Sequence, residues 1–486
     1  MLRKSHVRLA SRIFLLMALA GSLRLAWPAS APAQAAPEPT ARVVVGLQKA
    51  GRPIPADFLG FSYEAPALTG DYFDVRNHEL IRLLRNLGGG ALRFGGNSVE
   101  FTGWSRRGNN KMAGERAVVT PRDLDRLFAF SAKTGWPVIL GLNLGHYDPK
   151  LFADEAAYAV HHGGHHLLAL EIGNEPDLFM HNGLRPRSWG YADFRREWNA
   201  YARAIRARAP QAPISGPTTC CAAGWRWFPR FVPHEHSKLV FASYHIYPMS
   251  AAPSVPSDSP HYASIRNMLS PELMARVAKE VSQLATVAKS QNLPLRIAET
   301  NSASHGGKNG VSNVFAAALW GADYAFTLAE QGAAGLNFHG GFVCRGYTAI
   351  CRSGGQYLAQ PLYYGMLLFH ASTPARIVPV QVHTSVNLAA HAVLADDGTL
   401  SVVLINKDRK RSVKARIAGA GPYTRGTVLR LTAPSLEAQT GITFGGHAVG
   451  ADGSWTPGAG EAIRRHGRVF QVSLPAASAL LVRFEK

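Results

Sequence analysis

The stretch LEIGNEP, residues 170–176, places an apolar run directly before a polar Asn-Glu-Pro turn. Such a run is typical of a buried parallel strand, and the proline stops the strand from continuing. In a βα barrel the carboxyl ends of the strands form the face that carries chemistry. Asn174 and Glu175 are therefore predicted to lie at that face.

A second stretch, LRIAETN at residues 295–301, repeats the pattern and ends its apolar run at Glu299. The two stretches are the fourth and seventh of eight short apolar runs that alternate with helical patterns. The runs cover residues 58–63, 91–94, 137–144, 167–172, 212–215, 239–244, 295–298 and 334–338. Eight such units favour a closed (β/α)8 TIM barrel of the α/β class, although an open doubly wound sheet could use the same alternation.

Helix starts between the runs support this interpretation. Thr120-Pro121 and Ser270-Pro271 each combine a hydroxyl N-cap with proline at the first helical position. After residue 372 the period becomes alternating, and Asp396-Asp397-Gly398 separates two alternating runs as a hairpin turn would. The pattern predicts a β-sandwich domain behind the barrel.

The chain is thereby divided into four segments. Residues 1–35 have basic residues, an apolar stretch and a small-residue site, as a secretory signal peptide has. Residues 36–56 contain a strand that is predicted to join the β-domain. Residues 57–371 form the catalytic barrel, and residues 372–486 form the β-sandwich domain. The protein is expected to be secreted or periplasmic, without a membrane span.

Charge and cysteines restrict the partners and the compartment. The net charge of +20 falls to +15 once the five basic residues of the leader are removed, and this field should attract acidic polymers. A basic run at residues 407–416 is either an accessory polyanion site or a solvated hairpin tip. Cys344 and Cys351 have a spacing that suits a loop-closing disulfide, while the pairing of the adjacent Cys220 and Cys221 stays open.

The two glutamates together indicate a reaction. Strands four and seven lie across an eight-stranded barrel, so Glu175 and Glu299 would face each other over a bound sugar. Glycoside hydrolysis needs such a pair, because one carboxyl protonates the leaving oxygen while the other attacks the anomeric carbon or activates water. Retention of configuration requires a separation of about 5 to 5.5 Å between the carboxyls.

Four motifs in this order resemble glycoside hydrolase family 79, the heparanase and β-glucuronidase family. They are LRFGGN at residues 92–97, EIGNEP at 171–176, ETNS at 299–302 followed by Gly306-Gly307, and QPLYY at 360–364. The resemblance covers the barrel and the β-domain. It implies that Glu175 is the acid/base and Glu299 the nucleophile of a retaining enzyme, and its character is closest to a bacterial heparanase.

The resemblance also implies which residues bind the sugar. A glucuronic acid carboxylate would be held by the amides of Gly306 and Gly307 and by the hydroxyl of Tyr363. Amides and a phenol stabilise an anion without placing a full positive charge beside the nucleophile. The remaining substrate-binding residues are predicted to be Glu64, Asn97, Asn174, His245 and Tyr247, with Tyr247 bonded to Glu299 and Tyr244 as its competitor.

The expected function is that of an endo-β-glucuronidase acting on heparan sulfate or a related acidic glycosaminoglycan. An exo-acting β-glucuronidase and a non-catalytic polyanion-binding barrel are the alternatives. No metal or organic cofactor is expected, since the histidines at residues 161–166 precede the fourth strand and lie at the opposite face. No nucleic-acid motif is present, and a monomer is expected.

Overall fold

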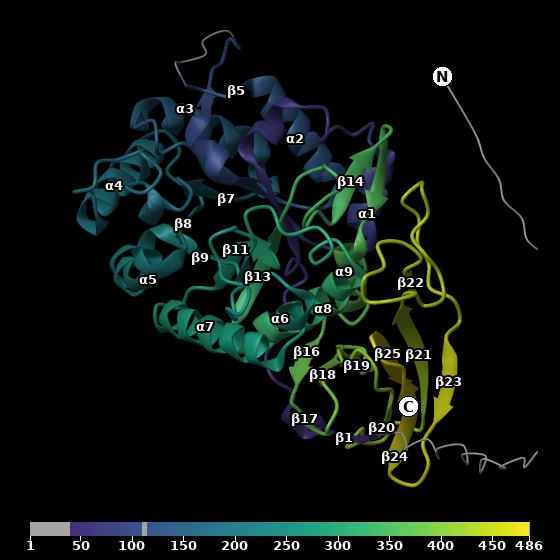
Figure 1. Ribbon diagram of the computed structural model, residues 1–486. Coiled ribbons are helices and arrows are strands. Elements are labelled where there is room, and N and C mark those ends of the chain that lie inside the picture. The colour runs from purple at the N-terminus through teal and green to yellow at the C-terminus, as the bar shows by residue number, and fades with distance from the viewer. Residues whose placement is uncertain (1–38, 109–113, 486) are drawn as a thin grey trace, which may run out of the picture. The chain divides into compact units, whose positions relative to one another are not determined.

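A closed barrel of parallel strands forms the larger part of the computed structural model, which describes residues 39–108 and 114–485 (Figure 1). The predicted signal peptide lies outside the described residues. In chain order the barrel strands are β2 (Gly60–Glu64), β3 (Ala91–Gly95), β6 (Val138–Leu142), β7 (Leu167–Ile172), β8 (Ile214–Thr219), β9 (Leu239–Ile246), β11 (Leu295–Thr300) and β13 (Ala333–His339).

Each predicted apolar run overlaps one of these strands. Pairing of β13 with β2 and of β11 with β9 closes the ring, which excludes the open doubly wound sheet. The TIM barrel prediction is therefore confirmed. The strands are buried on both faces because helices cover the outside of the ring, as parallel sheets require.

The helices of the described residues surround the barrel. They are α1 (His78–Asn86), α2 (Pro121–Thr134), α3 (Pro149–Gly163), α4 (Tyr191–Arg208), α5 (Cys221–Glu235), α6 (Ile265–Met268), α7 (Pro271–Ser290), α8 (Phe315–Gln331) and α9 (Pro361–His370). Both predicted helix starts are found. The Thr120 amide donates to Asp123 Oδ2 at 3.0 Å, and Ser270 Oγ accepts from the Leu273 amide at 3.1 Å. These caps satisfy amides that have no partner within the helix.

Short strands lie in the loops at the carboxyl-terminal face of the barrel. They are β4 (Thr102–Trp104), β5 (Ala117–Val119), β10 (Met249–Ser250), β12 (Ala303–Ser304), β14 (Ile350–Ser353) and β15 (Gln356–Ala359). β10 pairs with β12, so the loops that follow β9 and β11 are tied together. Among the described residues, no helix is both long and apolar enough to cross a membrane.

The C-terminal domain contains two sheets, and the first includes a strand from before the barrel. β1 (Thr40–Val45) pairs with β17 (Val380–His383) and β20 (Val413–Ala418), and β20 pairs with β24 (Val469–Leu474). The second sheet holds β16 (Arg376–Val378), β18 (Leu388–Leu394), β19 (Leu400–Asn406), β25 (Ser478–Glu485), β21 (Arg425–Thr432), β22 (Thr443–Phe444) and β23 (Glu461–Arg464). Apolar residues of both sheets share one core, as in a β-sandwich.

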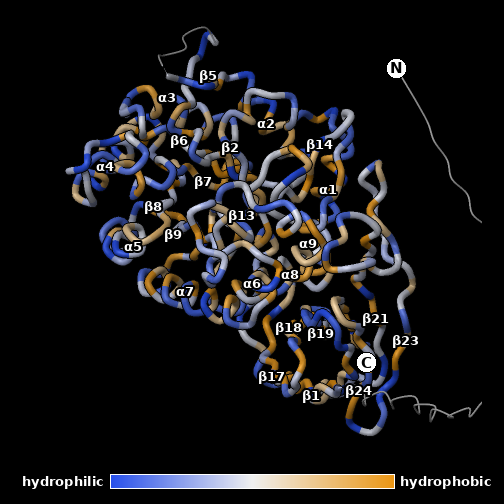
Figure 2. The backbone as a smooth tube through the Cα atoms, viewed as in Figure 1, coloured by the Kyte–Doolittle hydropathy of each residue, from blue (hydrophilic) through white to orange (hydrophobic). Residues whose placement is uncertain are grey.

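Helix α8 joins the barrel to this domain. It is buried along its length, and α8 and α9 are largely orange in the hydropathy view (Figure 2).

One charged cluster interrupts the apolar surface between α8 and the β-domain. His391 on β18 contacts Asp323 at 3.0 Å and Glu330 at 2.8 Å, and Lys407 Nζ donates to Asp323 at 2.6 Å. Both acids belong to α8, so ion pairs connect the helix to the β-domain.

This cluster makes stability depend on pH. Burial lowers the pKa of His391, but Glu330 and Asp323 outweigh it and raise the pKa to about 9. Because the folded pKa lies above that of an unfolded histidine, the stabilisation is complete below about pH 6.5 and is lost as pH rises through about 9. His391→Gln should lower the free energy of unfolding in urea by about 3 kcal/mol at pH 6.

The same substitution should cost little at pH 10. His383→Gln, at an exposed histidine of β17, is the matched control and should leave the unfolding free energy unchanged at both values. An equal loss from His391→Gln at pH 6 and pH 10 would contradict the ion-pair explanation.

Candidate active site

A cavity of about 720 Å³ opens at the carboxyl ends of the barrel strands, where the chemistry of this fold is found. Both predicted catalytic glutamates line it. Five of the predicted binding residues line it as well: Glu64, Asn97, His245, Tyr247 and Gly306. The lining also includes His261, which lies in the loop that follows β9.

Glu175 lies in the turn that follows β7, the fourth barrel strand. Its backbone is left-handed, at φ 50° and ψ 51°, and its amide donates to the Thr218 carbonyl at 2.9 Å. A residue other than glycine in this region is strained, and the following proline begins a short 3-10 turn. The bend takes Glu175 out of the strand and directs it into the cavity. There its Oε1 lies 3.1 Å from His245 Nδ1.

Glu299 lies opposite on β11 and is held from two sides. Its Oε2 accepts from Arg93 Nη1 at 2.8 Å, and its Oε1 accepts from the Tyr247 hydroxyl at 2.9 Å. Tyr247 is thus the tyrosine that bonds Glu299. Its predicted competitor, Tyr244, instead donates to the Cys221 carbonyl.

Arg93 connects the barrel interior to the site. It is fully buried, and its guanidinium donates to Glu171 at 2.6 Å, Ser62 at 2.9 Å and Asn174 at 2.9 Å as well as to Glu299. Asn174 lies behind the cavity wall in this network, and its amide also reaches Asn97 at 3.3 Å. Asn174 was predicted to bind substrate, but it does not line the cavity and instead contacts Arg93 and Asn97.

The surroundings of Glu299 keep it ionised. Burial by itself would raise its pKa, but the charges of His339, His245 and Arg93 and the Tyr247 hydrogen bond lower it to about 2. The same carboxylate, together with Glu64, raises the pKa of His339 against the effect of burial. Glu299 is a carboxylate rather than an acid across the neutral range, as a nucleophile must be.

The two carboxylates lie close together in the cavity. One oxygen of Glu175, one oxygen of Glu299 and a ring nitrogen of His245 all lie within 4.8 Å of one another. Inverting enzymes need about 6.5 to 9.5 Å between the carboxyls to admit a water molecule. The oxygens here are closer than that.

These same three residues are the group of potential metal ligands found among the described residues. Both oxygens of Glu299 already accept hydrogen bonds, and the Arg93 guanidinium compensates its charge. A cation bound there would be repelled by Arg93 at close range. The arrangement is better suited to moving a proton and forming a bond to carbon.

The prediction for Tyr363 was wrong. This residue is fully buried on α9, and its hydroxyl donates to the Leu83 carbonyl at 2.7 Å instead of facing the cavity. Proline at position 361 starts a helix here, and the helix directs Tyr363 toward α1. Gly307 is also displaced from the lining. It packs behind the wall, where an added Cβ would lie 2.8 Å from the Tyr347 amide nitrogen.

Tyr347 is the tyrosine that lines the cavity beside Gly306. Its amide donates to the Gly306 carbonyl at 3.3 Å, and Asn301 Nδ2 donates to its carbonyl at 3.2 Å. A Cβ at Gly346 would collide with the Gly306 carbonyl, so only glycine permits this approach. Burial raises the pKa of Tyr347, and its phenol therefore stays protonated as a hydrogen-bond donor.

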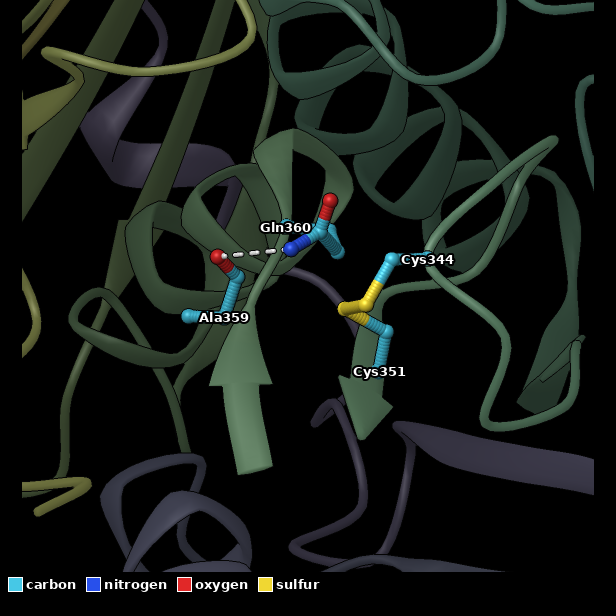
Figure 3. The surroundings of a disulfide bond; sticks show 4 residues. All are labelled: Cys344, Cys351, Ala359 and Gln360. Carbon is cyan, nitrogen blue, oxygen red and sulfur yellow. Dashed lines mark hydrogen bonds between the residues drawn. A yellow bond between two sulfur atoms is a disulfide. The ribbon is translucent and has the colours of Figure 1, made fainter. Parts of the chain in front are cut away.

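A disulfide closes the loop that carries Tyr347. Cys344 and Cys351 are bonded, as their spacing suggested, and Gln360 and Ala359 lie next to the bond (Figure 3). Cys220 and Cys221 are free thiols, and both line the cavity. Arg93, His339 and Tyr347 also belong to the site, and the sequence alone did not predict a role for them. The cysteine pair around Tyr347 was the available signal, whereas no pattern pointed to the partners of Arg93.

Parts of this sequence are similar to the sequences of known proteins. Residues 390–481 match the sequence family described as the glycosyl hydrolase family 79 C-terminal beta domain, and residues 156–255 match glycoside hydrolase family 44. A β-glucuronidase of Aspergillus niger is 25% identical over 404 residues, which cover 74% of this chain and 72% of the relative. A β-glucuronidase of Neurospora crassa is 27% identical over 197 residues, covering 37% of this chain and 34% of that protein.

Solved structures share the fold. A 4-O-α-L-rhamnosyl-β-D-glucuronidase from Fusarium oxysporum 12S superimposes with a TM-score of 0.74 at 22% identity, covering 89% of this chain and 97% of that chain. A family 51 arabinofuranosidase from Xanthomonas axonopodis pv. citri has a TM-score of 0.69 at 15% identity and covers 92% of this chain and 100% of its own. At these identities the structures support the architecture alone.

The position of Arg93 leads to a testable change in pH dependence. In Arg93→Gln the guanidinium is lost, so the pKa of Glu299 should rise and the acid limb of kcat/KM should move up by about one pH unit or more. Arg93→Lys keeps the charge and should shift the limb less. Because two buried carboxylates lose their partner, Arg93→Gln should also lose about 3 to 5 kcal/mol of stability.

Arg296→Gln is the matched control, because Arg296 is a buried barrel arginine that bonds Asn337 rather than Glu299. It should lower stability and leave the acid limb in place. An acid limb that moves equally in both variants would show that general loosening of the barrel, and not the charge of Arg93, controls Glu299.

Proposed function

We propose that the chain is a glycosidase of the glycoside hydrolase family 79 type that cuts the bond formed by a β-linked glucuronic acid with retention of configuration. The observation that carries this proposal is the pair Glu175 and Glu299, whose oxygens face each other within 4.8 Å in the barrel cavity. That spacing favours double displacement over attack by water.

In the proposed reaction Glu299 attacks the anomeric carbon while Glu175 protonates the leaving oxygen. The attack breaks the glycosidic bond and forms a glycosyl-enzyme ester on Glu299. Glu175, now a base, removes a proton from water, and the water oxygen displaces Glu299. His245 lies within hydrogen-bond distance of Glu175 and fixes the orientation of its carboxyl through both steps.

Selectivity for a uronic acid is assigned to Gly306 and Tyr347. Both line the cavity within the loops that follow β11 and β13, on the side of Glu299. In the described part of the chain the Gly306 amide donates no hydrogen bond to another protein group. A protonated phenol and a backbone amide can therefore bind a sugar carboxylate while leaving the charge of Glu299 undisturbed.

We further propose that the substrate is an acidic glycosaminoglycan such as heparan sulfate and that cleavage is internal. The net charge of +20 for the whole chain supports binding of a polyanion. An exo-acting β-glucuronidase is the second candidate, and the two fungal relatives are named β-glucuronidases. Export from the cytoplasm remains part of the proposal, and the Cys344–Cys351 disulfide supports an oxidising compartment.

Trapping with a 2-fluoro glucuronide tests the mechanism. The fluorine slows hydrolysis of the glycosyl-enzyme, so mass spectrometry of peptides should find the label on Glu299. Glu175→Gln should slow kcat by about 10² to 10⁴ for substrates with poor leaving groups. The loss should be smaller for an aryl glucuronide whose leaving group needs no proton. A label on another carboxylate would overturn the assignment.

Selectivity is tested with a matched pair of tyrosine variants. Tyr347→Phe removes a phenol from the cavity and should raise KM for an aryl β-glucuronide by about tenfold, with little effect on the corresponding β-glucoside. Tyr363→Phe removes a phenol on α9 and should change stability without changing the ratio of the two activities. The opposite result would restore Tyr363 as the carboxylate ligand.

The mode of cleavage is decided by sizing the products of heparan sulfate. Internal cleavage should give a falling distribution of oligosaccharides from the start of the digest. Release of monosaccharide alone would replace the endo proposal with the exo one. Cleavage of a neutral aryl glycoside without any glucuronide cleavage would overturn both.

A further inference from the structure

We propose that a groove between helix α6 and the loop after β19 is a second binding site for an anionic polysaccharide, separate from the place where the bond is cut. The groove encloses about 420 Å³. One wall is Ile265, Arg266 and Leu269, and the other is the loop of residues 407–411. Asn387 Nδ2 donates to the Leu269 carbonyl at 2.9 Å and joins the two walls.

The lining of the groove is strongly basic. It contains one carboxylate, that of Asp408, and five cationic side chains. The cationic residues are Arg266, Lys407, Arg409, Lys410 and Arg411. Three of the cations have partners, since Lys407 pairs with Asp323, Arg409 with Glu437 and Arg411 with Asp408. Arg266 and Lys410 are exposed, and their side chains have no hydrogen bond or ion pair among residues 39–108 and 114–485.

The partnered cations shape the groove, and the unpaired ones leave charge for a ligand. Asp408 accepts from the amides of Lys410 and Arg411 at 3.0 Å, so the loop is held in a turn that presents consecutive basic side chains. Like charges held close together repel each other, and a bound anion relieves that repulsion. Arginine adds a planar fork that matches carboxylate and sulfate groups.

Positive charge continues along the neighbouring sheet. β20 follows this loop directly, and its exposed residues include Arg416. Arg416 is in register with Arg42 on β1 and with Gln471 on β24. No acidic side chain lies in register with Arg416 on either neighbouring strand, so the surface suits an extended anion.

The groove and the catalytic cavity share one loop. His261, in the loop that follows β9, lines the cavity, and Arg266, five residues later, lines the groove. Tyr262 between them forms a bridge with Ser250, another cavity residue. A chain of several sugars cut in the cavity therefore has a basic surface on the other side of this loop. A single terminal glucuronide would not need it.

This inference rests on the proposed function in that the substrate is taken to be an acidic polymer. The test is the double variant Arg266→Glu/Lys410→Glu, neither residue being part of the catalytic cavity. The variant should elute from immobilised heparin at lower salt, and its KM for heparan sulfate should rise by about tenfold. Its kcat/KM for a small aryl β-glucuronide should stay within about twofold of the wild type.

The matched control is Arg122→Glu/Arg203→Glu on helices α2 and α4. It makes the same change in net charge at exposed arginines whose side chains have no partner among the described residues. The control should elute close to the wild type. Equal displacement of both double variants would overturn the proposal, because total charge would then explain the binding.

Elution from heparin needs no hydrolysis, so the binding result stays informative if the wild type cleaves no glucuronide. A wild type that cleaves no glucuronide would count against the proposed function but not against the groove as a binding site. A short DNA duplex serves as a competing polyanion. If the groove variant loses only its affinity for DNA and keeps that for heparin, the site is not a polysaccharide site and the proposal fails.

Discussion

The active site depends on one buried guanidinium. Arg93 is inaccessible to solvent and bonds Glu171, Ser62, Asn174 and Glu299 from the third position of β3. Its partners come from the strands and strand ends of β2, β7 and β11, so the interaction exists only when the barrel is closed. A buried charge without its partners is costly, and closure of the ring and formation of the site are therefore coupled.

The coupling explains how two glutamates at similar strand ends acquire different environments. Glu299 contacts a cation and a phenol that both favour its ionised form, and its pKa falls to about 2. Glu175 lies on a strained turn beyond the end of β7 and contacts a histidine instead. An acid/base residue must gain and lose a proton, whereas a nucleophile must stay charged. Arg93 and Tyr247 bond Glu299 but not Glu175, so the two carboxylates differ in their hydrogen-bond partners.

The β-domain contributes to the enzyme through its attachment as well as through its own core. Asp323 on α8 takes bonds from His391 and Lys407, which belong to β18 and to the loop after β19. Lys407 is also the first residue of the loop that forms the basic groove. The same segment therefore anchors the domain at one end and presents unpaired charge at the other, close to the loop that walls the catalytic cavity.

The sequence by itself determined the barrel, the sandwich and the position of Glu175 and Glu299 at one face of the barrel. The apolar runs that precede Glu175 and Glu299 are local patterns and can be read from the sequence. Because the carboxyl ends of barrel strands share one face, these patterns also place both glutamates at that face. Tertiary structure decided the rest. Tyr363 and Tyr347 are both tyrosines near glycine, but Pro361 builds Tyr363 into a helix, while a disulfide folds Tyr347 against Gly306. The partners of Arg93 lie 31 to 206 residues away along the chain, and no local pattern can predict which distant side chains meet around a buried charge.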